Sequence, residues 1–488
     1  MGLLQFSVAT ENFVSQSAVS RGDFITFDNR VIPAWSTLTE DGLSCRRQQP
    51  DSSKLRLLCR PADRDLVLQT TSLRENSSPY NLEVELARGE LSRLRHFYAL
   101  WTNAGLKTTP ELEDLISRAH AAFRQGIFSA RPSAAARESI CLTCRAVERL
   151  TQSYVAQRIM YRQQRTHHFP MSVGCRLTEI PTQEQAFLDT FNAVLVKTRW
   201  KDLEPRDGDY QWEKLDALVE WTLQKRLFPV GGPLLDLTSD CFPQWMSPWK
   251  GDLLNLQSFT SDFVETVVGR YVGKIRHWEV VCGANRGGEN ELTEEQRLNL
   301  VARAVEAAEA VDEQIQISLR VIQPWGEYLS DTKNRLSPIQ FVDALRRCGV
   351  KISEINLDLR FGIGPLCSLP RDMLAVSHLL DMWSLLQLPV SVMAAIPEGP
   401  RFDSASGNEA PPDEAAPDEA APEEISWQTK VLEDLFLMCL SKERVIGFYC
   451  LNWNDKAAPD QPLADDPEHI HPVVSCLEDL EDLYWPSE

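Results

Sequence analysis

Residues 354–361 read EINLDLRF, residues 371–386 read RDMLAVSHLLDMWSLL and residues 389–394 read PVSVMA. The first and last segments are short apolar runs, which are typical of strands in a buried sheet. The middle segment places apolar residues at the i, i+3, i+4 spacing of an amphipathic helix. This order predicts two parallel strands joined by a helix.

The same alternation begins near residue 170 and continues to the end of the chain. The predicted strands are 171–176, 192–198, 228–234, 275–282, 316–322, 354–361, 389–394 and 445–451. The predicted helices are 183–190, 212–225, 259–271, 293–311, 338–348, 371–386, 427–440 and 471–483. Eight such units favour an α/β fold of the closed (β/α)8 TIM barrel type. A doubly wound open sheet is the alternative, but no GxGxxG loop opens a helix.

The residues before the barrel have a different pattern. Residues 1–82 show short strand-like runs separated by Pro, Asp, Ser and Asn clusters, which predict a β-rich unit. Residues 83–169 show three amphipathic stretches, which predict a helical unit. A small β-plus-helical N-terminal domain therefore precedes a barrel at 170–488, and it carries no recognisable chemical motif.

The formal net charge of the 488 residues is -20. Most of this excess lies in two acidic segments, 401–424 and 460–488, and the absence of clustered Lys and Arg argues against nucleic-acid binding. Residues 399–424 form a low-complexity acidic repeat that we expect to be disordered. This insert follows the seventh predicted strand, so we expect it on the face where barrels bind ligands.

Nothing in the sequence predicts a membrane span or a secretory signal, and twelve Cys residues fit reduced thiols in a cytoplasm. Cys141 and Cys144 have the spacing of half a zinc site, but no second pair of ligands accompanies them. We therefore expect a cytoplasmic protein without a metal or cofactor, and a protein partner stays open.

Short motifs in the barrel carry a family resemblance. They are Phe191–Val194, Arg199-Trp200, Leu203–Pro205, Gly208–Trp212, Arg270–Val281, Leu388–Val392, Trp453–Asp455 and Pro462–Asp466. In order and spacing this set resembles glycoside hydrolase family 10, the endo-1,4-β-xylanases, over residues 170–485. The resemblance implies a retaining mechanism with two Glu residues, one as nucleophile and one as acid/base.

The positions that correspond to both catalytic residues have changed. The acid/base position at the end of the fourth strand is Gly283, and the nucleophile position at the end of the seventh is Ala394. Two other family motifs read Gly232–Leu237 and Leu195-Val196. The surviving matches are Arg199, Trp200, Trp453 and Asp455. Gln323–Tyr328 and Pro370–Asp372 further resemble a bacterial subgroup of family 10-like proteins.

Other polar and aromatic residues at the predicted strand ends are candidates for ligand binding. The candidates for carbohydrate binding are Arg199, Trp200, Asp236, Asn285, Gln323, Trp325, Tyr328, Arg360, Trp453 and Asp455. Glu327 and Asp358 could form a displaced catalytic carboxylate pair, or each could pair with a base, such as Asp358 with Arg360. Gln323–Tyr328 is either a ligand-binding floor or a structural turn. Glu279 lies four residues before Gly283, below the barrel mouth.

Three functions are compatible with these residues. The first is a carbohydrate-binding pseudo-glycosidase that has lost hydrolysis, which is our sequence-based prediction. The second is an O-glycosyl hydrolase with the relocated pair Glu327 and Asp358. The third is a non-catalytic scaffold or partner-binding barrel. A cleft lined by Trp200, Trp325 and Trp453 would favour the first two functions over the third.

Overall fold

The computed structural model describes most of the chain between residues 2 and 484. The residues not described in this range are 9–12, 15, 28, 41, 49, 63, 129–131, 167–168, 239–241, 250, 289–291, 331–332, 363–365, 397–426, 454–462 and 464–471. The acidic insert 399–424, Asp455 and the motif 462–466, apart from Leu463, therefore lie outside the described residues. No helix in the described part of the chain is long and apolar enough to cross a membrane.

The N-terminal unit contains two four-stranded sheets. One has the order β4-β5-β1-β8 and the other the order β3-β2-β6-β7. Their strands are β1 (Gly2–Ser7), β2 (Asp23–Ile25), β3 (Val31–Ile32), β4 (Ala34–Thr39), β5 (Gly42–Arg47), β6 (Lys54–Cys59), β7 (Leu66–Gln69) and β8 (Tyr80–Asn81), with the short helix α1 (Gln16–Ser20). Leu4 and Phe6 of β1 and Leu55 and Leu57 of β6 share one buried apolar cluster.

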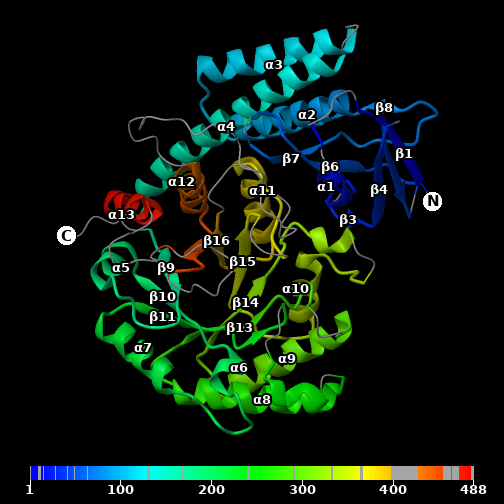
Figure 1. The fold of residues 1–488 in the computed structure, drawn as a ribbon. Coiled ribbons are helices and arrows are strands. Elements are labelled where there is room, and N and C mark those ends of the chain that lie inside the picture. The colour runs from blue at the N-terminus through cyan, green and yellow to red at the C-terminus, as the bar shows by residue number, and fades with distance from the viewer. Residues whose placement is uncertain are drawn as a thin grey trace, which may run out of the picture.

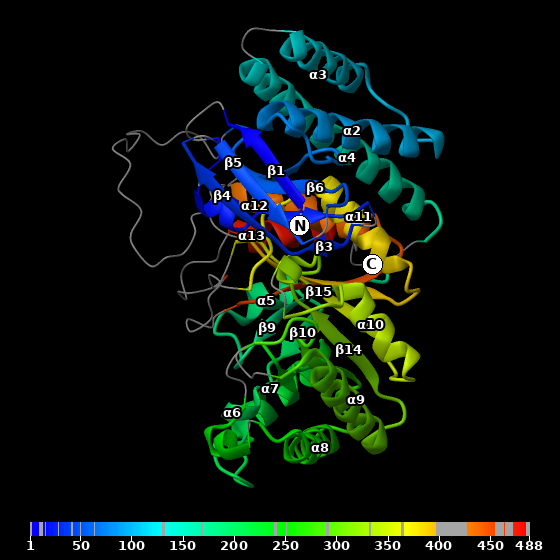
Figure 2. The same cartoon turned by 90° about the vertical axis from the view of Figure 1, so that its right-hand side faces the viewer.

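Three long helices follow these sheets: α2 (Leu82–Asn103), α3 (Pro110–Phe128) and α4 (Pro132–Gln163). Helix α2 begins where Asn81 accepts a hydrogen bond from the backbone N–H of Val84, which satisfies a free donor of the first turn. All three pack together, and α4 also contacts the barrel helices α11 (Met373–Ser384) and α12 (Trp427–Leu440). Figures 1 and 2 show the unit seated at one end of the barrel.

The barrel is closed, as the sequence predicts. Its parallel strands are β9 (Ser172–Leu177), β10 (Ala193–Val196), β11 (Phe228–Gly231), β12 (Leu235–Asp236), β13 (His277–Cys282), β14 (Gln316–Val321), β15 (Glu354–Arg360), β16 (Val390–Ala395) and β17 (Val445–Cys450). β17 pairs with β9, and β11 pairs directly with β13. The short β12 also pairs with β13 and belongs to the third barrel position, so eight positions form the ring.

The remaining helices surround this ring. They are α5 (Glu184–Thr190), α6 (Trp200–Leu203), α7 (Glu213–Gln224), α8 (Leu253–Arg270), α9 (Glu294–Val311), α10 (Pro338–Arg347) and α13 (Pro472–Tyr484), with the 3-10 turns η1 (Gln244–Trp249) and η2 (Glu327–Ser330). Helix α8 begins six residues before the predicted start at residue 259. The reason is Asp252, whose carboxylate accepts hydrogen bonds from the N–H groups of Leu254 and Asn255.

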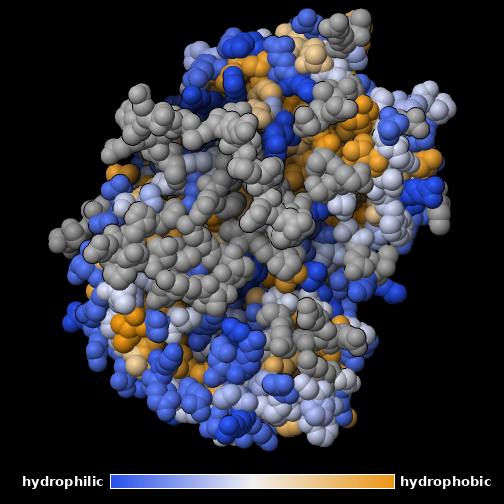
Figure 3. Space-filling model, in the orientation of Figure 1, coloured by the Kyte–Doolittle hydropathy of each residue, from blue (hydrophilic) through white to orange (hydrophobic). Residues whose placement is uncertain are grey.

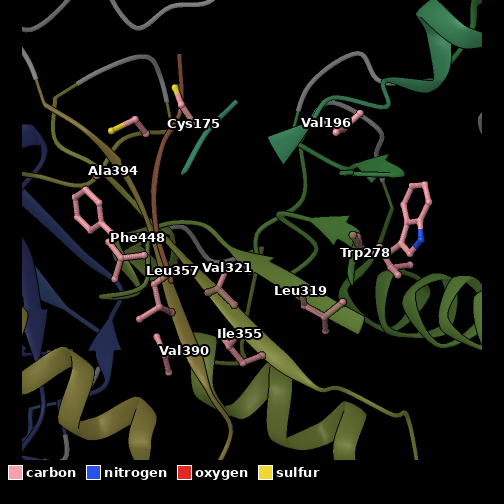
Figure 4. Packing of buried hydrophobic residues seen from close by; sticks show 14 of the residues in the cluster. Cys175, Val196, Trp278, Leu319, Val321, Ile355, Leu357, Val390, Ala394 and Phe448 are labelled. Carbon is pink, nitrogen blue, oxygen red and sulfur yellow. The ribbon is translucent and has the colours of Figure 1, made fainter. Parts of the chain in front are cut away.

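The surface of the outer helices is mostly hydrophilic. In Figure 3 blue residues dominate the lower edge, over α7 and α8, whereas orange residues gather at the upper right over the N-terminal unit. The main apolar core lies between the strands and these helices (Figure 4), and it includes Val321, Ile355 and Leu357. Because side chains alternate along a strand, the neighbouring residues of β14 and β15 face the inside of the barrel.

Candidate functional site

The acid/base position inferred from the sequence is closed by a neighbouring side chain. Gly283 directly follows β13 and has a φ of +72°, a conformation that residues with a side chain rarely adopt. A Cβ atom built on Gly283 would lie 2.0 Å from Cγ2 of Thr238. The structure therefore has no room for a glutamate here unless Thr238 moves.

The end of β16 carries two adjacent alanines, and they face opposite sides. Ala394 packs in the core that faces the helices (Figure 4). Ala395 packs against a second apolar cluster, which contains Met393, Tyr449 and Leu195. The residue facing the lumen at this strand end is thus Ala395, not Ala394, the nucleophile position inferred from the sequence. Neither alanine has a carboxylate.

Half of the lumen is filled by apolar side chains. The second cluster, which we call the apolar half, is formed by β10, β11, β16 and β17. Its buried members are Ala193, Leu195, Val230, Met393, Tyr449 and Leu451. A barrel of eight strands has an interior that side chains can fill, so this half is packed core rather than a pore.

The other half of the lumen, formed by β13, β14 and β15, is charged. Glu279 makes two contacts with Arg320, at 2.9 and 3.0 Å, and accepts a hydrogen bond from Asn356 at 2.8 Å. Both charged side chains are almost fully buried. Burial disfavours the charge on Arg320, but Glu279, together with Cys282 and Asp358, outweighs it and raises the pKa of the guanidinium. We call this the charged half.

The charged half also includes Asp358 and Arg360, at the carboxyl end of β15. Nε of Arg360 donates to Oδ1 of Asp358 at 2.8 Å, so the pair suggested by the sequence is present. Asp358 is 3% exposed. Burial works against the Arg360 charge, but Asp358 outweighs it and raises the pKa of that guanidinium. The second oxygen, Oδ2 of Asp358, has no hydrogen-bond partner among the described residues.

Glu327, the other catalytic candidate, lies in η2 and pairs with a residue that the sequence reasoning missed. Nη2 of Arg371 donates to Oε1 of Glu327 at 3.0 Å, and both side chains are largely buried. The Arg371 guanidinium also stacks over Trp325, 4.9 Å from the ring centroid. Arg371 belongs to the Pro370–Asp372 motif, so this motif contacts the Gln323–Tyr328 segment.

The Gln323–Tyr328 segment meets the N-terminal unit. Tyr328 and Leu329 share a small buried cluster with Ile25 and Val31, from β2 and β3. Tyr328 also donates its hydroxyl to the Leu336 carbonyl at 2.9 Å, and Nε2 of Gln323 donates to the Cys367 carbonyl at 3.1 Å. These contacts give the segment a structural role.

The Pro370–Asp372 motif extends the same contact between the N-terminal unit and the barrel. The Val67 N–H of β7 donates to the Pro370 carbonyl at 3.0 Å. Arg93 of α2 pairs with both Asp372 and Glu90. Burial favours the protonated form of Asp372, but Arg93 lowers the pKa of that carboxyl below its ordinary value. We call this contact region the seam.

Two of the three tryptophans proposed to line a cleft are core residues. Trp200 is 2% exposed, stacks on Phe263 with centroids 4.4 Å apart, and donates from Nε1 to Glu204. Trp453 is 1% exposed and packs edge-on against Phe187 and Phe191. Trp325 alone of the three is partly exposed, and it lies at the seam.

The remaining binding candidates have local partners. Asp236 accepts hydrogen bonds from the N–H and hydroxyl of Thr238. Asn285 exchanges two hydrogen bonds with the backbone of Ile322, at 2.8 and 3.2 Å. Arg199 is half-exposed and lies 3.5 Å from Asp202. No group of three His, Cys, Asp or Glu side chains within the described residues could hold a metal.

Residues 161–354 match the model of glycosyl hydrolase family 10, and the match extends from the end of α4 to the start of β15. This part of the barrel resembles glycosyl hydrolase family 10. Xylanase B from Clostridium stercorarium F9 is 14% identical, with a TM-score of 0.48 over 63% of this chain and 96% of that one.

Two further solved structures are similar to the family 10-like barrel. A GH10 endoxylanase retrieved from a sugarcane soil metagenome is 18% identical, with a TM-score of 0.48 over 64% of this chain and 97% of that one. A GH10 xylanase from Thermobacillus composti is 16% identical, with a TM-score of 0.47 over 64% and 96% of the two chains.

Proposed function

We propose that this protein is a pseudo-glycosidase: a family 10-like barrel that does not hydrolyse glycosidic bonds and serves as a scaffold for its N-terminal unit. The observation that carries the proposal is Gly283, whose surroundings leave no space for an acid/base glutamate. A retaining mechanism also needs a nucleophile, and both alanines at the end of β16 lack one.

The relocated-pair hydrolase is less well supported. Glu327 pairs with Arg371 and Asp358 pairs with Arg360. In each carboxylate one oxygen is therefore occupied by a guanidinium, which leaves less of the group available to a substrate. Each carboxylate keeps one oxygen without a hydrogen bond among the described residues, which is the observation that favours this second candidate.

The prediction of carbohydrate binding at the barrel mouth requires exposed tryptophans that stack on the sugar rings. The burial of Trp200 and Trp453 weakens that interpretation, and the seam contacts of Gln323–Tyr328 favour the scaffold. In this proposal the loops after β14 and β15, which bind ligands in other barrels, bind the N-terminal unit.

A test uses an activated 2-deoxy-2-fluoro-xylobioside, which traps the covalent intermediate of a retaining glycosidase. We expect the intact mass of the purified protein to stay unchanged after incubation. A mass increase of one glycosyl group, lost in Glu327→Gln or Asp358→Asn but kept in the surface variant Lys274→Met, would overturn the proposal.

Restoring the family residue should also fail. Gly283→Glu should produce no hydrolysis and should lower the melting temperature, because its Cβ meets Thr238. The companion variant Thr238→Gly/Gly283→Glu removes that obstacle and should recover part of the stability. Equal melting temperatures for Gly283→Glu and wild type would show that the position is open.

A further inference from the structure

A pocket of about 670 Å³ lies within the seam, between the N-terminal unit and the barrel. Its walls come from β2, β6, β7 and α2 on one side and from the 324–326 loop, α10 and α11 on the other. This volume lies within the range of small-molecule sites, and domain interfaces are a common place for them. Neither Gly283 nor Ala394 belongs to the lining of this pocket.

The lining of this seam pocket is rich in cationic side chains, although the chain as a whole is strongly acidic. The basic residues are Arg30, Lys54, Arg56, Arg93, His96, Arg371 and His378, against the single acid Glu90. Arg56, Arg93 and Arg371 are each paired with a carboxylate. The acids in these three pairs, Asp23, Asp372 and Glu327, are not among the residues that line the pocket.

Two cations of the lining have no such partner. Among the described residues, Nζ of Lys54 makes no hydrogen bond or ion pair, and the same is true of the Arg30 guanidinium. Lys54 is half-buried on β6, whereas Arg30 is exposed at the pocket rim. A partly buried ammonium without a hydrogen bond or ion pair is costly, so a protein keeps one chiefly where a ligand supplies the negative charge.

The electrostatic surroundings of the pocket agree with this geometry. Burial lowers the pKa of Lys54, and the nearby charges of Arg93 and Arg56 lower it further, while Glu90 acts in the opposite direction. On the opposite wall, burial lowers the pKa of His378, as do His96, Lys442 and Lys54, against Asp381. The nearby charges of Arg93 and Arg56 therefore disfavour the charge on Lys54, and a bound anion would offset them.

Asn29 and His378 also line the seam pocket. Nδ2 of Asn29 lies 3.3 Å from Nε2 of His378, and this contact joins the N-terminal unit to α11 across the pocket. The ring of Phe97 packs edge-on against His378, which fixes the imidazole. Trp325, with one face covered by Arg371, supplies an apolar wall.

We propose that the seam pocket binds a small anion that carries a phosphate or carboxylate group, with Lys54 and Arg30 as its charged contacts. Charge-assisted hydrogen bonds from ammonium and guanidinium groups are the usual means of recognising both anions. The site uses residues from the N-terminal unit and the barrel together, so a bound anion would stabilise their association.

The test is titration calorimetry on the full-length chain with inorganic phosphate, glucose 6-phosphate and glucuronate, and with neutral glucose as the control probe. We expect at least one anionic probe to bind and glucose not to bind. Preferential binding of glucose 6-phosphate would identify a phosphorylated ligand, and preferential binding of glucuronate a carboxylated one. Affinity should fall as salt screens the charges.

Lys54→Met keeps most of the apolar stem and removes the charge, so it should weaken binding by about tenfold or more. Arg30→Gln, at an exposed position, should weaken binding in the same direction. The matched control Lys274→Met removes an exposed lysine of the barrel and should leave affinity unchanged. Absence of binding by every anionic probe, or equal affinities in wild type, Lys54→Met and Arg30→Gln, would overturn the proposal.

Discussion

The two halves of the barrel lumen are filled by different kinds of side chain. The apolar half fills its space with residues such as Leu195, Met393 and Tyr449. The charged half fills its space with Glu279, Arg320 and Asp358, and each of these charges has an opposite charge beside it. This difference shows that charged residues inside a barrel can have a structural role. Their charged atoms are engaged in ion pairs and hydrogen bonds and are less available for a reaction.

The largest expected effect comes from breaking the charged half. Glu279→Ala leaves Arg320 buried without its counter-charge, which should lower the free energy of unfolding by about 4 kcal/mol. Chemical denaturation measures this loss. The double variant Glu279→Leu/Arg320→Met removes both charges and should be clearly more stable than Glu279→Ala. Equal stabilities of the single and double variants would contradict a paired role.

A smaller loss is expected in the apolar half. Leu195→Ala creates a cavity beside Met393 and Tyr449 and should lower the free energy of unfolding by about 3 kcal/mol. The matched control is Leu385→Ala at an exposed position, which should change stability by less than about 0.5 kcal/mol. A loss at Leu195 no larger than the control would mean that this half of the lumen is not packed.

Glu354, at the boundary between the two halves, should make the stability of the protein depend on pH. The Ser391 hydroxyl of β16 donates a hydrogen bond to the Glu354 carboxyl group of β15, and burial raises the pKa of that carboxyl to about 7. The folded state therefore holds this proton more tightly than the unfolded state does. Stability should fall as pH rises from about 4.5 to 7, by an amount on the order of 1 kcal/mol for each unit of pKa shift.

The control for this effect is Glu354→Gln, which cannot ionise. Its unfolding free energy should lack that pH-dependent loss, so the difference between the variant and wild type should grow from pH 4.5 to pH 7. Parallel stability curves for the two proteins over this range would show that Glu354 titrates normally.

The fold could be predicted from local sequence patterns. The eight predicted strands and eight predicted helices of the barrel follow from apolar spacing within short segments, whereas the short elements β12 and α6 were not predicted. The order of the segments specifies the parallel ring. The boundary of α8 was wrong because it depends on a single capping carboxylate, Asp252, rather than on periodicity.

The site was harder to predict because its decisive contacts join distant segments. The loss of a glutamate at Gly283 is visible in the sequence, but its obstruction by Thr238 is not. The partner of Glu327 is Arg371, 44 residues away. Apolar patterns also cannot distinguish an exposed stacking tryptophan from a core one, which is why Trp200 and Trp453 were placed in a cleft.

The measurement that tests the central claim most directly is reducing-sugar release from xylan by the purified full-length protein, which detects retaining and inverting hydrolysis alike. The claim is that the lumen carboxylates are structural and the barrel does not hydrolyse glycosidic bonds. We predict release at the level of a buffer blank for wild type. Release above that level, reduced by about a thousandfold in Asp358→Asn or Glu327→Gln while Lys274→Met keeps it, would contradict the claim.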